Sequence, residues 1–255
     1  MGRVLAVANQ KGGVGKTTTV VNLAACLAAM GHAVLALDCD PQGHCTAGLG
    51  VDKGRLAGTL YDVLAGVREM GEVVVRTPWA VDLVPATVDL AGAEVELAGE
   101  PEREERLRRA LADVQGKYRF VLMDCPPSLG LLTLNALVAA EGVVVPIQCE
   151  YFALEGLGQL VRTVQLVRRS YNPGLHIEGV VLTMFDTRTN LSSQVAAEVR
   201  QYFREKVYST VIPRSVRLSE APSHGQPINW YDPRSRAAES YMALAKEVLA
   251  REYGR

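Results

Sequence analysis

A glycine-rich run near the start of the chain ends in lysine and threonine, the residue types that hold phosphate groups. Glycines let backbone N–H groups turn inward around oxygen atoms without a clashing Cβ, and a lysine adds positive charge. A threonine hydroxyl can ligate Mg²⁺. The run therefore predicts a site for a nucleoside triphosphate with its magnesium ion. It reads Lys11-Gly12-Gly13-Val14-Gly15-Lys16-Thr17-Thr18.

The segments on either side of this run are those that a phosphate site needs. Residues 3–8 (RVLAVA) form a short run that is typical of a strand, and residues 17–30 have helical spacing. A helix that starts near Lys16 directs the positive end of its dipole at the phosphates. The spacing fits the second half of the P-loop pattern GxxxxGK[ST], but Gln10 stands at the first glycine position and Lys11 follows it. This is a deviant P-loop (Walker A motif) with an additional lysine.

Three aspartates follow predicted strands and could complete the site. Residues 33–37 predict a strand before Asp38 and Asp40, and residues 120–123 predict one before Asp124. Carboxylates at the C-terminal ends of strands line the crevice where ligands bind in open α/β sheets. They could hold the Mg²⁺ shell or orient a water for attack on the γ-phosphate. One such aspartate alone is as often a helix N-cap.

Apolar strands alternate with helical segments along the chain. Further strands are expected at 81–84, 143–147, 177–185 and 207–212, and helices at 60–64, 87–97, 101–114, 129–140, 154–170, 191–203 and 236–253. This alternation predicts an α/β fold: a single doubly wound domain, residues 1–255, with a mostly parallel central sheet flanked by helices. We expect the first two strands to form a parallel pair, residues 41–58 to be a loop, and Thr59 and Thr87 to cap helices.

Composition argues against several other classes of protein. Hydrophobic residues make up 48% and charged residues 22%, which is typical of a globular chain with a full core. The five cysteines are odd in number and form no CxxC pair, so neither a disulfide framework nor a metal pattern is predicted. No signal peptide or membrane span is expected. Residues 161–255 carry 14 Lys or Arg against 9 Asp or Glu, a net charge of +5. This excess either arises by chance or indicates an anionic partner.

Together these segments resemble the ParA/Soj family of chromosome- and plasmid-partitioning ATPases, within the wider SIMIBI-type class of P-loop NTPases that includes MinD and the nitrogenase iron protein. The first matching motif marks the wider class, whereas the second and the last are more specific to ParA/Soj. No N-terminal helix-turn-helix extension is expected, as in the short chromosomal type. The matching segments are ANQKGGVGKTTT (8–19), LDCDPQG (37–43), LMDCPPSLG (122–130), EYFALEG (150–156) and VIPRSVRLSEAPSHG (211–225).

The resemblance implies a role for each matching residue of the phosphate site. Lys11 matches the signature lysine that reaches the partner's nucleotide across a dimer interface. Lys16 and Thr17 match the P-loop lysine and the Mg²⁺ ligand. Asp40 matches the aspartate needed for hydrolysis, and Asp124 matches the Walker B position. The implied catalytic residues are Lys11, Lys16, Asp40 and Asp124, and the implied metal ligands are Thr17, Asp40 and Asp124.

The segment after the last expected strand has two implied roles. Pro213, Arg214 and Ser215 match the loop that contacts adenine, although Ser215 stands where relatives often have asparagine. Arg188, Arg214 and Arg217 match the region that binds DNA non-specifically in the ATP dimer. Arginine binds DNA phosphates with little preference for the base sequence. The positive charge of the C-terminal part of the chain would then serve to bind DNA.

The resemblance also implies cofactors and partners. The cofactors are ATP and Mg²⁺, and the implied assembly is an ATP-dependent homodimer. The implied partners are non-specific double-stranded DNA of the nucleoid and a ParB/Spo0J-type centromere-binding protein that stimulates slow hydrolysis. A cytoplasmic, nucleoid-associated location without a membrane partner follows.

Three other functions stay open. A MinD-like membrane ATPase ends in a basic amphipathic helix, whereas the last helix here has an apolar stripe and few cations, which favours a docked core helix. An iron–sulfur reductase needs cysteines that share a cluster across a dimer axis, and Cys39 and Cys125 are not in that pattern. A metabolic P-loop enzyme would need an acceptor-binding motif, and none is apparent.

Overall fold

One mixed sheet runs through the molecule, with β1 near its centre. The computed structural model describes residues 2–150 and 157–253. The strands lie in the order β3-β4-β2-β5-β1-β6-β7-β8, and neighbours are parallel except β3 and β4. The strands are β1 (Arg3–Val7), β2 (Val34–Asp38), β3 (Val75–Arg76), β4 (Asp82–Val84), β5 (Phe120–Asp124), β6 (Gly142–Gln148), β7 (His176–Phe185) and β8 (Val207–Pro213).

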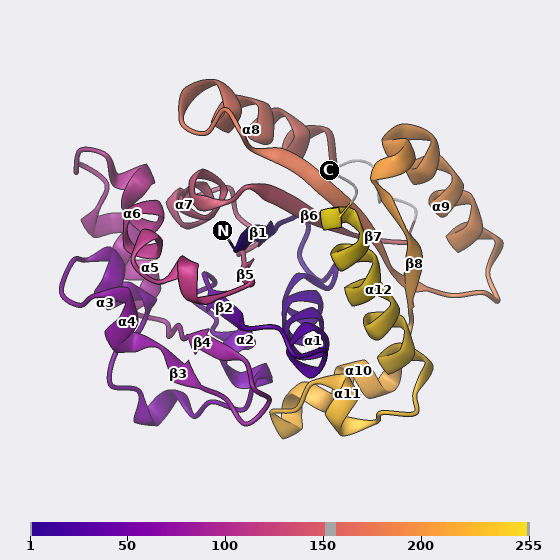
Figure 1. Cartoon of the computed structure of the whole chain (residues 1–255). Coiled ribbons are helices and arrows are strands. Elements are labelled where there is room, and N and C mark those ends of the chain that lie inside the picture. The colour runs from indigo at the N-terminus through magenta and orange to yellow at the C-terminus, as the bar shows by residue number, and fades with distance from the viewer. Residues whose placement is uncertain (1, 151–156, 254–255) are drawn as a thin grey trace.

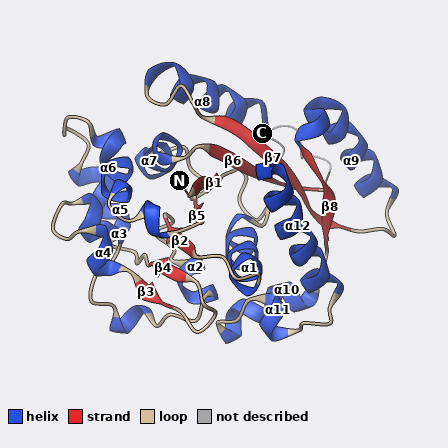
Figure 2. Ribbon diagram, in the orientation of Figure 1, coloured by secondary structure: helices blue, strands red, loops and turns tan. Residues whose placement is uncertain are grey.

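Helices cover both faces of the sheet (Figure 1; Figure 2). One layer contains α1 (Lys16–Ala29), α2 (His44–Gly48), α10 (Val216–Glu220), α11 (Ile228–Tyr231) and α12 (Arg236–Tyr253). The other contains α3 (Leu60–Leu64), α4 (Met70–Val73), α5 (Leu90–Glu96), α6 (Arg106–Ala112), α7 (Leu131–Ala139), α8 (Leu157–Ser170) and α9 (Asn190–Phe203). The α/β architecture expected from the alternating segments is confirmed.

Each central strand supplies side chains to both layers, which explains its unbroken apolar sequence. In β5, Phe120 and Leu122 pack in the core with α1 and α12, whereas Val121 and Met123 pack in the core with α7 and α8. The expected docking of the last helix is also confirmed, because its apolar stripe is buried against the first of these cores.

Several local expectations were wrong. β1 and β2 are parallel but do not pair, because β5 lies between them. Residues 41–58 were expected to be a loop but contain α2. This helix has five residues and starts after Gly43, which has a positive φ, so its sequence lacks the usual helix signals. Thr59 does cap α3, but α5 begins after Asp89 rather than at Thr87. The helix expected at 101–114 is only Arg106–Ala112. The start of the helix expected from 154 lies outside the described residues.

Candidate active site

The glycine-rich loop leaves the C-terminal end of β1 and enters α1. Gly13 has φ +74° and Gly15 has φ +90°, backbone conformations that side chains with a Cβ rarely adopt. Gly15 is the N-cap of α1, and no side chain caps this helix. The first N–H groups of α1 therefore stay available for an anion, and the helix dipole favours one.

Neighbouring strands hold the loop from both sides. The Thr183 hydroxyl, on β7, donates to the Val14 carbonyl at 2.8 Å. The Asn9 side-chain amide donates to the Pro146 carbonyl, on β6, at 2.7 Å. The same side chain accepts the Lys11 N–H at 3.0 Å. The loop is thus fixed before any phosphate binds, which lowers the entropy cost of binding.

The Lys16 side chain folds back over the loop. Its ammonium donates to the Lys11 carbonyl at 3.1 Å, and the residue is only 7% exposed. Burial lowers the pKa of Lys16, while the nearby carboxylates of Asp124 and Asp40 act in the opposite direction. Lys11 itself is half-buried.

Asp38 and Asp124 lie side by side as register partners at the ends of β2 and β5, and both are fully buried. Asp38 accepts the Thr46 N–H and hydroxyl, each at 2.7 Å, and the Asp40 N–H at 3.3 Å. Neither oxygen of Asp124 accepts a hydrogen bond within the described structure, although the Thr17 hydroxyl is near enough to favour its charged form.

Burial and mutual repulsion disfavour charge on this aspartate pair. Burial raises the pKa of Asp38 to about 6 despite its three donors. Burial and the charge of Asp38 raise the pKa of Asp124 well above its usual range. A buried carboxylate is costly unless it is paired, so a cation bound at this position would stabilise the charged form of the pair.

Asp40 lies on the segment that joins β2 to α2, close to the same edge of the sheet. It is half-buried, and its carboxylate accepts the Gln42 N–H at 2.9 Å. Within the described residues, no group of three or more His, Cys, Asp or Glu could hold a metal ion by itself. A cation here would therefore need ligands from a hydroxyl, from water or from phosphate, as Mg²⁺ in nucleotide sites does.

A cavity of about 280 Å³ lies beside the first turn of α1. Its lining brings Thr18 together with Met184 and with the sequence-predicted residues Pro213, Arg214 and Ser215. Met184, on β7, has φ +50°, which is uncommon outside glycine and costs strain. Gly12 is exposed and has open space around it.

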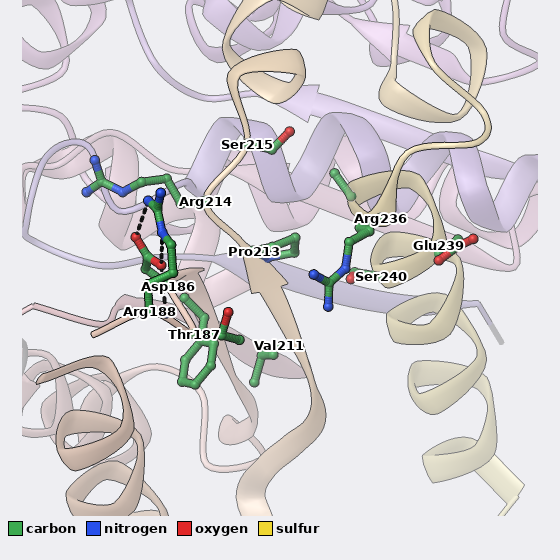
Figure 3. A pocket seen from close by; sticks show the side chains of 12 residues that line it. Asp186, Thr187, Arg188, Val211, Pro213, Arg214, Ser215, Arg236, Glu239 and Ser240 are labelled. Atoms are coloured by element: carbon green, nitrogen blue, oxygen red, sulfur yellow. Dashed lines mark hydrogen bonds and ion pairs between the residues drawn. The ribbon is translucent and has the colours of Figure 1, made fainter. Parts of the chain in front are cut away.

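Two of the three sequence-predicted DNA-binding arginines share a second cavity, of about 620 Å³ (Figure 3). Arg188 is bound to Asp186 through two nitrogens, at 2.9 and 2.7 Å. Arg214 pairs with Glu150 at 3.1 Å. Arg236, which sequence reasoning missed, faces the same cavity and forms no ion pair with any described residue.

The third arginine lies outside this cavity. Arg217, on α10, is 57% exposed and pairs with Glu220 at 3.0 Å and with Asp232 at 3.6 Å. Each of the three predicted arginines therefore has a carboxylate partner on the surface. The motif at 150–156 lies outside the described residues except for Glu150.

Sequence reasoning also missed residues that support the site. Thr46 donates its N–H and its hydroxyl to Asp38, eight residues before it in the chain, and the Thr183 hydroxyl donates to the Val14 carbonyl, 169 residues away. Threonine is common in both helices and strands, so no sequence signal separates these two from other threonines.

The glycine-rich strand–loop–helix at the centre of a mostly parallel sheet defines a P-loop nucleotide-binding ATPase. Residues 2–177 match a family model described as an AAA domain. The chain is 58% identical to the sporulation initiation inhibitor protein Soj of Bacillus subtilis, over 98% of this chain and 99% of that protein. It is 54% identical to the chromosome partitioning protein ParA of Caulobacter vibrioides, over 99% and 96% of the two chains. The chain belongs to the ParA/Soj family of chromosome-partitioning ATPases.

Solved structures agree in fold. A Mycobacterium smegmatis protein named cobyrinic acid a,c-diamide synthase, with bound ADP and magnesium, has a TM-score of 0.89 and 42% identity, covering 100% of this chain and 97% of that one. MinD of Pyrococcus horikoshii complexed with Mg-ADP has a TM-score of 0.80 and 29% identity, covering 97% and 96%. None of the helices that the structure describes is both long and apolar enough to span a bilayer.

Proposed function

We propose that this partitioning ATPase binds ATP and Mg²⁺ at the glycine-rich loop, dimerises on ATP, and in that state binds DNA without sequence preference. The observation that carries the proposal is the buried Asp124 carboxylate. It ends the strand beside β1, has no hydrogen-bond partner among the described residues, and lies near the Thr17 hydroxyl. A fold retains such a costly group where a ligand compensates it.

The residues present fit a magnesium ion. Asp124 and Thr17 supply hard oxygen atoms, and Asp40 stands close to the same edge of the sheet with a half-buried carboxylate. Bound there, Mg²⁺ would neutralise phosphate charge. Asp40 would position the attacking water, and Asp124 would hold the ion.

The two lysines of the loop have different proposed roles. Lys16 would exchange the Lys11 carbonyl for phosphate oxygens of its own subunit's nucleotide. Lys11 would reach the nucleotide of a second copy, so that each protomer neutralises the phosphate charge held by the other. The loop from Lys11 to Thr18 would hold the phosphates through its backbone N–H groups, with Gly12, Gly13, Val14 and Gly15 forming the turn.

The cavity beside Thr18 is the proposed site for the base. Pro213 and Met184 offer apolar surface to a purine ring, and Ser215 offers a hydroxyl. Because Met184 lies on β7, Pro213 ends β8 and Ser215 follows it, the base would lie between α1 and these two strands.

DNA binding is proposed for the surface that contains Arg188, Arg214 and Arg217. Each of these side chains is exposed, and each would exchange a carboxylate for a DNA phosphate. Breaking the ion pair with the carboxylate offsets part of the free energy gained from the DNA phosphate, so a single copy of the chain should bind DNA weakly. A dimer doubles the contacts on one duplex and gains affinity by effective concentration.

The remaining proposals follow from the family. A ParB/Spo0J-type protein would stimulate hydrolysis, and loss of the γ-phosphate would loosen the dimer and release DNA. A cytoplasmic protein associated with the nucleoid fits this cycle.

A DNA titration with ATP, with ADP and without nucleotide, at stated salt, tests the proposal. We expect tight binding only with ATP, and an affinity that falls as salt rises. Arg217→Glu should lose DNA binding while ATP-dependent dimerisation persists. Arg55→Glu is the matched control, because Arg55 also pairs with a carboxylate at i,i+3 spacing and is exposed. Equal DNA affinity of Arg217→Glu and wild type contradicts the assigned surface.

A further inference from the structure

Trp79 joins two segments that are far apart in the chain. Its indole N–H lies 3.1 Å from the Leu49 carbonyl oxygen and 3.1 Å from the Gly225 carbonyl oxygen. Leu49 directly follows α2, and Gly225 directly follows the short 3₁₀ turn η5 (Ala221–His224). One donor is thus shared between two carbonyls on separate elements.

The two joined segments touch through their backbones. Gly50 has φ +77° and Gly225 has φ +61°. A Cβ on Gly225 would lie 2.7 Å from the Gly50 Cα, and a Cβ on Gly50 would lie 2.8 Å from the Gly225 carbonyl oxygen. No side chain fits between the segments, and the Trp79 indole closes the contact from outside.

The turn that carries Trp79 is itself well supported. It is the tip of the hairpin between β3 and β4, where the Thr77 N–H and hydroxyl donate to the Val81 carbonyl at 3.0 and 2.8 Å. The Trp79 N–H donates to the Thr77 hydroxyl at 3.3 Å. The ring packs on Trp230 with centroids 5.5 Å apart, and Trp230 is 55% exposed.

Both joined elements border the nucleotide site. On one side, α2 carries Thr46, which holds Asp38. On the other, η5 carries Pro222, which lines the cavity beside Thr18 proposed for the base. Pro222 and α2 also line a neighbouring cavity of about 390 Å³.

We infer that Trp79 is a positioning residue for nucleotide binding, which fixes η5 as a wall of the base cavity by tying Gly225 to the end of α2. The inference rests on the proposed base site. Without the tie, η5 can move away from α1, and the wall that meets the base is no longer preformed. The phosphate loop has its own supports on β6 and β7 and keeps its shape.

The test compares a ligand with a base and a ligand without one. Trp79→Phe keeps an aromatic ring but removes the shared N–H. Affinities for ATP and for inorganic tripolyphosphate, each with Mg²⁺, are measured by displacement of a fluorescent ATP analogue. We expect Trp79→Phe to weaken ATP about tenfold, which corresponds to roughly 1.4 kcal/mol, and to leave tripolyphosphate within about twofold of wild type.

Trp230→Phe is the matched control, because the Trp230 side chain contacts Trp79 without bonding either carbonyl, and it should change neither affinity. If Trp79→Phe folds poorly, Gly225→Ala replaces it, because an added Cβ forces the two segments apart. Gly225→Ala should weaken ATP binding and leave tripolyphosphate binding unchanged. Equal weakening of both ligands, or no weakening of ATP, overturns the inference. If wild type binds ATP no more tightly than tripolyphosphate, the proposed base site itself fails.

Discussion

Replacing Asp124 by asparagine should stabilise the nucleotide-free protein while impairing its function. The carboxylate is fully buried, lies beside Asp38, and accepts no hydrogen bond from the described residues. A buried charge that is compensated only in part, here by Lys16 and the Thr17 hydroxyl, costs several kcal/mol, and burying an asparagine amide without partners costs about 1–3 kcal/mol. The difference leaves a gain of about 2 kcal/mol for Asp124→Asn, and a domain of this size gains roughly 2–4 °C in Tm per kcal/mol.

Asp38→Asn is the matched control, because Asp38 has the same burial and sits in register with Asp124. Its carboxylate accepts three hydrogen bonds, two of them on one oxygen. An amide nitrogen cannot accept these donors, so Asp38→Asn should lose about 1–3 kcal/mol. Two chemically identical substitutions at neighbouring positions should therefore shift stability in opposite directions.

The assay is thermal and urea unfolding of both variants, with and without MgATP, between pH 4 and pH 8. The pKa of Asp124 is raised in the fold, so its cost is present above the unfolded pKa and shrinks as pH falls towards it. The advantage of Asp124→Asn should thus vanish near pH 4, and MgATP should stabilise wild type much more than the variant. A lower Tm for Asp124→Asn than for wild type at pH 7.5 without ligand would contradict the assigned cost of the buried carboxylate.

Three further predictions address the loop, hydrolysis and the thiols. Lys16→Ala should abolish ATP binding in a calorimetric titration, because Lys16 is the buried cation of the loop; retained affinity contradicts its role. Asp40→Ala should bind ATP but hydrolyse it far more slowly, leaving the protein on DNA, and normal phosphate release would show the assignment to be wrong. All five cysteines are free and buried, and burial raises the pKa of Cys26 to about 12. At pH 8 a thiol reagent should react slowly with the native protein. In guanidinium, which unfolds the chain, it should react with all five thiols. A thiol that reacts fast in the native protein contradicts this prediction.

The phosphate loop could be read from the sequence because its determinants are local. Gly13 and Gly15 occupy positive-φ positions that only glycine adopts readily, and Lys16 begins the expected helix. Strands such as β5 were also predictable, since an apolar run of this length beside charged residues predicts a buried parallel strand. Each of these features depends on residues close together in the chain.

The relations between distant segments could not be read in this way. The adjacency of Asp38 and Asp124 depends on β5 entering the sheet between β1 and β2, and strand order is set by pairing far along the chain. The bonds from Trp79 to Leu49 and Gly225 span 30 and 146 residues. A tryptophan that donates to two distant backbone carbonyls leaves no pattern in the sequence.

In the proposed cycle, ATP joins two copies of the chain because Lys11 of each protomer neutralises phosphate charge held by the other. Analytical ultracentrifugation of Asp40→Ala with saturating MgATP tests it most directly, since slow turnover keeps the nucleotide intact. We predict a dimer with ATP, a monomer with ADP or without nucleotide, and a monomer for Asp40→Ala combined with Lys11→Ala under all conditions. A monomer with saturating MgATP, or a dimer that persists without Lys11, would contradict it.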